Sequence, residues 1–69
     1  MIDVKVKELI AIGASVTANC QPCLKYHVGK ALEKGVNEKD IQEAISVGKM
    51  VRKGAAGKMD EFASAVVKG

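Results

Sequence analysis

The stretch Thr17-Ala18-Asn19-Cys20-Gln21-Pro22-Cys23 determines how the chain folds, because it combines a turn with the start of a helix. Asn19 is a residue type that caps helices, and Pro22 is tolerated in a first helical turn, where its missing amide hydrogen would have no partner. We therefore expect a helical hairpin that turns at residues 17–19. Its second helix would begin at Cys20 and carry both thiols in its first turn.

Three helical segments follow from the spacing of apolar residues, which recur every three or four positions. The first covers about residues 3–18, and the second runs on to Gly35, a residue type that commonly ends helices. The third continues past Gly54-Ala55-Ala56-Gly57, where the glycines indicate a break, a kink or close contact with another helix. We favour one long helix there. No strand-like alternation appears, so the sequence predicts an all-α, three-helix core in a single domain over residues 1–69.

The third helix has a well-marked beginning. Asn37 is the expected cap, and Asp40 stands at the third helical position of a weaker capping box. Val36 and Ile41 are spaced to form a hydrophobic staple across this end. The residues expected to be buried are Ile2, Val4, Val6, Leu9, Ala11, Ile12, Gly13 and Val16 in the first helix, Leu24, Val28, Ala31 and Leu32 in the second, and Ile41, Ile45, Val51, Ala55, Phe62 and Val66 in the third.

The apolar content is high for so small a chain. A domain of about this size buries only about 60% of its unfolded surface, and small scaffolds usually need a staple, a metal or an oligomer. The two cysteines lie too close in sequence to close a long loop. With 48% hydrophobic residues in 69, the chain has more apolar surface than one copy can bury. We therefore expect a helical homo-oligomer.

The charge pattern argues against nucleic acid and membranes as partners. The net charge is +3, and no arginine cluster or interleaved aromatic residues accompany it. We interpret Lys49, Arg52 and Lys53 as a solvated helix face. The uncharged residues 9–18 are too few to span a bilayer, which takes about 20, and no leader-like run opens the chain. The sequence thus predicts a cytoplasmic protein, in which a Cys-x-x-Cys pair is more often catalytic or metal-binding than structural.

Cys20, Cys23 and His27 carry the most chemistry, and they include both cysteines and the only histidine of the chain. Free amides at a helix N-terminus favour the thiolate, which is the nucleophile. His27 lies four residues beyond Cys23, shares its face and can exchange a proton with a thiol. Position alone leaves the nucleophile open, because the helix end favours Cys20 and the imidazole favours Cys23. Tyr26 is expected to be a packing residue.

Glu8 interrupts an apolar ridge between Val4 and Ile12. A buried carboxylate is costly unless it is paired. In the expected hairpin, Glu8 would lie about 15 Å and His27 about 10 Å from the turn, at a rise of about 1.5 Å per residue. The two should therefore come near the same level, where Glu8 could orient the imidazole or relay a proton. The alternative is a surface carboxylate near a helix N-terminus.

Glu8, Cys20, Cys23 and His27 together form the pattern E-x11-C-x2-C-x3-H. This pattern resembles the signature of the alkylhydroperoxidase D-like group within the carboxymuconolactone decarboxylase family, and the resemblance extends over nearly the whole chain. It implies an all-helical fold assembled into trimers or hexamers. It also implies thiol-dependent reduction of hydroperoxides or disulfides, with the cysteines cycling between dithiol and disulfide and a Glu/His pair as proton relay. No bound cofactor is implied; electrons would come from a lipoyl group or another dithiol carrier protein.

The chain also departs from the group that it resembles. The alkylhydroperoxidase itself is longer and has a duplicated helical arrangement, and it has a histidine where this chain has Pro22. The decarboxylase branch lacks the Cys-x-x-Cys pair, so lactone decarboxylation is not expected here. A further possibility is a degenerate member of the family that only assembles with a longer partner.

A second class of function is a non-catalytic metal-binding or oligomerisation module. It would use Cys20, Cys23 and His27, with Glu8 or a group from another subunit as the fourth ligand. Structural zinc sites usually take their second pair of ligands from a second short motif, and the sequence contains none. We therefore favour redox chemistry and predict no metal.

Overall fold

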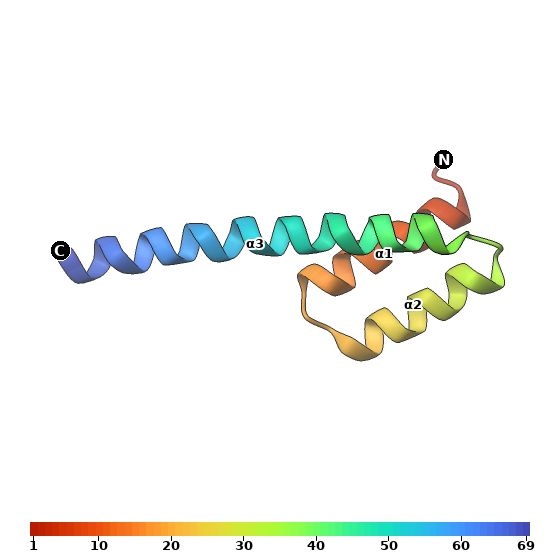
Figure 1. The fold of residues 1–69 in the computed structure, drawn as a ribbon, viewed down its shortest axis with the longest axis horizontal. Coiled ribbons are helices and arrows are strands. Elements are labelled where there is room, and N and C mark those ends of the chain that lie inside the picture. The colour runs from red at the N-terminus through yellow and green to blue at the C-terminus, as the bar shows by residue number, and fades with distance from the viewer.

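The structure, a computed structural model, describes residues 1–69 and consists of three helices without strands (Figure 1). Helix α1 spans Val4–Thr17, α2 spans Gln21–Glu33 and α3 spans Glu38–Lys68. Helices α1 and α2 form the predicted hairpin, and α3 then runs back past α1. The predicted all-α, three-helix fold is confirmed. None of the helices has the length and apolar character needed to cross a membrane.

The core is small and lies where the three helices meet. It consists of four buried residues, with five partly buried ones packed around them: Ile12, Ala31, Val36 and Ile41, then Leu9, Leu24, Val28, Ala44 and Ile45. Two helices cannot enclose α1 on all sides, so Val4 and Val6 at its start are exposed, as is Ile2 just before it, against the prediction. Leu32 is also exposed, because only one side of α2 packs against the other helices.

Helix α3 extends well beyond the rest of the chain (Figure 1). It contains 31 residues and α1 only 14, which correspond to about 46 and 21 Å at 1.5 Å per residue. The second half of α3 therefore has no partner within the chain. Four residues predicted to be buried are exposed for this reason: Val51, Ala55, Phe62 and Val66.

The predicted start of α3 is confirmed. The Asn37 Oδ1 atom accepts a hydrogen bond from the Asp40 amide at 2.8 Å, and Val36 and Ile41 are buried in the same cluster. The Asp40 carboxylate accepts from the Asn37 side chain rather than from its backbone amide, so the reciprocal half of the capping box is replaced by a side-chain contact. α3 runs unbroken through Gly54 and Gly57, as favoured from the sequence.

The close helix contact lies instead at Gly48, where α3 crosses α1. A Cβ atom added to Gly48 would collide with the Gly13 carbonyl oxygen and lie 2.9 Å from the Val16 Cβ. The Thr17 hydroxyl donates to the Gly48 carbonyl at 2.9 Å across the same contact. The absence of a side chain at Gly48 therefore lets the two backbones approach and fixes the end of α1 against α3.

We expect Gly48→Ala to destabilise the fold by about 1–3 kcal/mol, because the cost of overpacking exceeds the gain in helix propensity. Gly54→Ala is the matched control. A Cβ at Gly54 meets nothing within 4 Å, so this change should stabilise the helix by up to about 1 kcal/mol. Urea denaturation followed by circular dichroism measures both. Equal midpoints for the two variants would show that the Gly48 contact does not constrain the fold.

Candidate active site

The turn before the cysteines is set by the end of α1. The Cys20 amide donates to the Ser15 carbonyl at 3.0 Å, and the Asn19 amide donates to the Val16 carbonyl at 3.1 Å. This pair of bonds is a Schellman motif, which needs a left-handed residue at the position of Asn19. Asn19 has a φ of 56°, a conformation that asparagine tolerates better than most residues. The turn thereby ends α1 and delivers Cys20 to the start of α2.

The expected boundary of the second helix is corrected by this turn. Asn19 does not cap α2, because its backbone closes α1. Cys20 is the N-cap residue, with an extended backbone and no side-chain capping bond, and the helix begins at Gln21. Pro22 lies in the first turn, as predicted.

Cys20 and Cys23 are joined as a disulfide, with their Cα atoms 5.3 Å apart. Cys20 is half-buried against the end of α1, whereas Cys23 is exposed on the first turn of α2. The sulfur atoms are therefore close enough to bond to each other. An approaching molecule would meet Cys23 more readily than Cys20.

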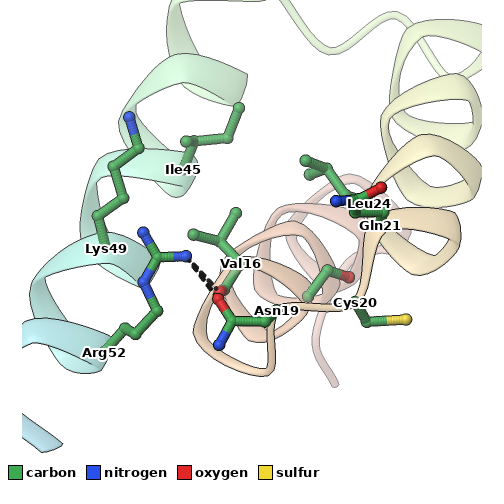
Figure 2. A pocket seen from close by; sticks show the side chains of 9 residues that line it. Val16, Asn19, Cys20, Gln21, Leu24, Ile45, Lys49 and Arg52 are labelled. Carbon is green, nitrogen blue, oxygen red and sulfur yellow. Dashed lines mark hydrogen bonds between the residues drawn. The ribbon is translucent and has the colours of Figure 1, made fainter. Parts of the chain in front are cut away.

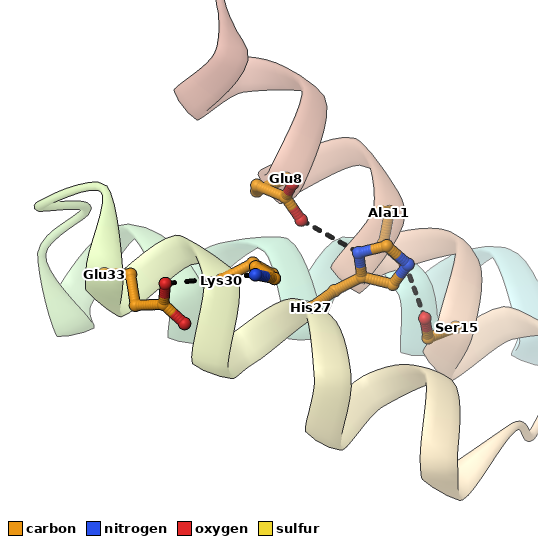
Figure 3. A network of polar contacts seen from close by, with 6 residues as sticks. All are labelled: Glu8, Ala11, Ser15, His27, Lys30 and Glu33. Atoms are coloured by element: carbon orange, nitrogen blue, oxygen red, sulfur yellow. Dashed lines mark hydrogen bonds and ion pairs between the residues drawn. The ribbon is translucent and has the colours of Figure 1, made fainter.

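Glu8 and His27 form the second pair of the site (Figure 3). The His27 Nδ1 atom lies 2.8 Å from Glu8 Oε1, and the two side chains are 30% and 17% exposed. The hairpin brings them to the same level, as the residue spacing predicts. With the Nδ1 hydrogen donated to the carboxylate, the Nε2 atom of a neutral ring is the one free to accept a proton. Glu8 thereby fixes both the orientation and the tautomer of the imidazole.

Tyr26 contributes to this pair in a way that the sequence analysis did not identify. Its ring stands edge-on to the His27 ring, with 5.1 Å between the centroids and 84° between the planes. The Lys30 ammonium lies 5.6 Å from the centre of the Tyr26 ring. Tyr26 is nevertheless 59% exposed, so it contacts the imidazole at the surface rather than filling the core.

The four predicted site residues thus form two pairs: Cys20 and Cys23 at the start of α2, and His27 of α2 with Glu8 of α1. His27 lies one turn beyond Cys23 on α2, and no hydrogen bond joins its ring to either sulfur while the disulfide is closed. No three side chains among the histidine, cysteines, aspartates and glutamates lie close enough together to hold a metal ion. The geometry therefore offers a dithiol or disulfide beside an oriented base, rather than a set of metal ligands.

Arg52 belongs to the surroundings of this site, which corrects its interpretation as part of a solvated face, whereas Lys49 is exposed, as expected. The Arg52 guanidinium donates to the Val16 carbonyl at 3.1 Å and to Asn19 Oδ1 at 2.9 Å (Figure 2). It thereby holds the turn that leads into Cys20. Lys49 lines a cavity next to the same turn. No signal in the sequence separates Arg52 from Lys53, which is exposed, as expected.

The fold and the site define a small all-helical protein that carries a Cys-x-x-Cys disulfide next to a Glu–His pair. Residues 1–65 of this chain match the carboxymuconolactone decarboxylase family. The chain belongs to this family, which confirms the resemblance found in its sequence.

One curated relative is a protein of Paracoccus denitrificans described as "Uncharacterized protein 4 in cox locus". It is 36% identical over 55 residues, which make up 80% of this chain and 50% of that relative. The chain thus spans about half the length of the relative that it matches. No solved structure matches the chain significantly.

Proposed function

We propose that the protein is a thiol-dependent oxidoreductase that reduces hydroperoxides or disulfides by cycling Cys20 and Cys23 between dithiol and disulfide. The observation that carries the proposal is the bonded cysteine pair at an exposed helix end, one turn from a carboxylate-oriented imidazole. Membership of the carboxymuconolactone decarboxylase family supports it, because the resemblance to the alkylhydroperoxidase D-like group of that family implies this chemistry. The proposed setting is the cytoplasm, where thiols are kept reduced.

Cys23 is the proposed nucleophile because it is exposed and because His27 follows it by one turn. Its thiolate attacks a peroxide oxygen, the O–O bond breaks, and an alcohol leaves after it takes up a proton. The resulting sulfenic acid is attacked by the Cys20 thiol, which forms the disulfide and releases water. With a disulfide substrate, the first product is a mixed disulfide, and the Cys20 thiol then displaces the remaining thiol.

The two electrons must be returned by an external dithiol, either a lipoyl group or another dithiol carrier protein. A donor thiolate attacks the exposed Cys23 sulfur, Cys20 leaves as thiolate, and the second donor thiol closes the donor's own disulfide. The proposed role of His27 is to take the thiol proton before attack and to return a proton to a departing group through Nε2. Glu8 holds the imidazole in the tautomer that this requires.

We also propose that the working form is a homo-oligomer, of the trimeric or hexameric kind implied by the family. Along α3, the residues that face α1 are followed on the same helix face by apolar residues that nothing covers in this chain: Met59, Phe62 and Val66. An apolar face that continues an existing helix interface is typical of a contact between subunits. A second copy of the chain is the partner that would cover it.

The function is tested by following one cycle of the purified, metal-free protein by mass spectrometry. One equivalent of hydroperoxide should lower the mass of the reduced chain by two hydrogens, and dihydrolipoamide should restore it. Continuous turnover with excess dithiol and hydroperoxide, or with a small disulfide, should follow. Thiols that stay unreactive in a protein carrying stoichiometric zinc would reject the proposal in favour of a metal-binding module.

A further inference from the structure

A cavity of about 260 Å³ lies between the end of α1, the start of α2 and the middle of α3 (Figure 2). No acidic residue is among those that line it: Ser15, Val16, Asn19, Cys20, Gln21, Leu24, Ile45, Lys49 and Arg52. Its volume falls just below the range of about 300–1,000 Å³ typical of sites for drug-sized ligands. The cavity is therefore suited to a smaller molecule.

The cavity carries positive charge that the protein does not neutralise. The ion pairs of the chain join His27 to Glu8, Lys30 to Glu33 and Lys58 to Glu61, so neither Lys49 nor Arg52 has a carboxylate partner. Arg52 uses one terminal nitrogen, Nη1, for both of its bonds to the turn. Its other N–H groups remain available to a ligand.

The start of α2 adds to this charge. Cys20 and Gln21 line the cavity, and no side chain caps the helix. The first amides of an uncapped helix keep a partial positive charge, which attracts anions. Two unpaired cations and a free helix end thus meet at one cavity.

The remaining wall is apolar and is formed by Val16, Leu24 and Ile45 from the three helices. A bare inorganic anion would leave this wall without a partner, whereas a hydrocarbon chain would cover it. In Figure 2 the Cys20 sulfur points away from Lys49 and Arg52. A ligand whose carboxylate lies at the cations would lay its hydrocarbon part along this wall, toward Cys20, which also lines the cavity.

We propose that this cavity binds a small organic carboxylate through Lys49 and Arg52. This proposal rests on the proposed function. The preferred substrate would then be a carboxylic acid whose hydrocarbon part carries the hydroperoxide or disulfide. The carboxylate anchors the molecule, and its hydrocarbon part runs toward Cys20, the cysteine that lines the cavity and is bonded to Cys23. Cations at the far end of the cavity select this class over neutral molecules of the same shape.

Binding is tested on the oxidised protein by NMR titration with hexanoate and with hexanamide, which has the same shape without the charge. Hexanoate should shift the amide signals of residues that line the cavity, such as Gln21 and Leu24. Lys49→Gln should weaken hexanoate binding about fivefold, the effect of a partly exposed ion pair. Lys53→Gln removes the same charge from an exposed position one turn further along α3 and should leave it unchanged.

Three results would overturn the inference: shifts confined to other parts of the chain, equal binding of hexanamide, or equal affinities in the two lysine variants. Hexanoate that fails to bind because a second copy covers the cavity would overturn it too. A kinetic arm compares 6-hydroperoxyhexanoate with its amide, and Lys49→Gln should lower the ratio of their kcat/KM values about fivefold. The NMR titration needs no turnover. It therefore tests whether the cavity binds a carboxylate even if the protein proves not to have the proposed activity.

Discussion

Replacing Cys23 with serine should reduce steady-state turnover of hydroperoxides and disulfides by on the order of 10³-fold or more, because no nucleophile remains. Cys20→Ser should reduce it as severely for a different reason. Cys23 can still attack, but no neighbouring thiol then resolves the product. The disulfide spans only three residues of separation, so neither change should unfold the chain, and circular dichroism provides that control.

A single-turnover experiment separates the two variants. Cys20→Ser should consume one equivalent of hydroperoxide and gain one oxygen atom in mass, as a trapped sulfenic acid. Cys23→Ser should consume none in the same time. The reverse assignment would make Cys20 the nucleophile, as its place at the helix end first suggested. Full turnover by either variant would reject the paired-thiol mechanism.

Much of the site could be predicted from the sequence because it depends on local spacing. The hairpin places residues at fixed distances from its turn, so the rise per residue is enough to bring Glu8 to His27. The cysteine pair likewise follows from a three-residue separation at a helix end. These relations hold within one helix or across one turn, where helical geometry leaves few alternatives.

What the sequence could not provide are the contacts that α3 makes with distant residues. Arg52 is 33 positions from its partner Asn19, and nothing in a run of basic residues distinguishes an inward arginine from a solvated one. Asn19 itself suits both a cap and a left-handed turn, since its short polar side chain serves either. Only the end of α1 decides between these roles, because it needs a left-handed residue to satisfy its last carbonyl groups.

The exposed half of α3 presents the opposite situation. The apolar period predicted burial for Phe62 and Val66, yet both are more than half exposed in the single chain. Periodicity identifies which face of a helix will be covered but not which molecule covers it. This misplaced expectation is consistent with the proposed oligomer, in which these residues would be buried between subunits.

His27→Ala should lower turnover by about 10²–10³-fold, the usual contribution of a positioned general acid or base. Glu8→Gln should lower turnover by about 10²-fold, although the glutamine side chain is almost isosteric with that of glutamate. The amide of a glutamine can donate to Nδ1, which would favour the tautomer with its hydrogen on Nε2 and remove the free acceptor of the ring. The measurement is kcat/KM for one hydroperoxide and one small disulfide.

Glu33→Gln is the matched control for Glu8→Gln. Glu33 is exposed and forms only a long contact of 3.9 Å with Lys30, so neutralising it should change turnover by less than about twofold. The double variant Glu8→Gln/His27→Ala provides the sharper test. If the carboxylate acts only through the imidazole, the double variant should be as slow as His27→Ala alone, because groups that act as a unit are not additive. Losses that multiply instead would mean that Glu8 acts on the cysteines by another route, and the relay would have to be abandoned.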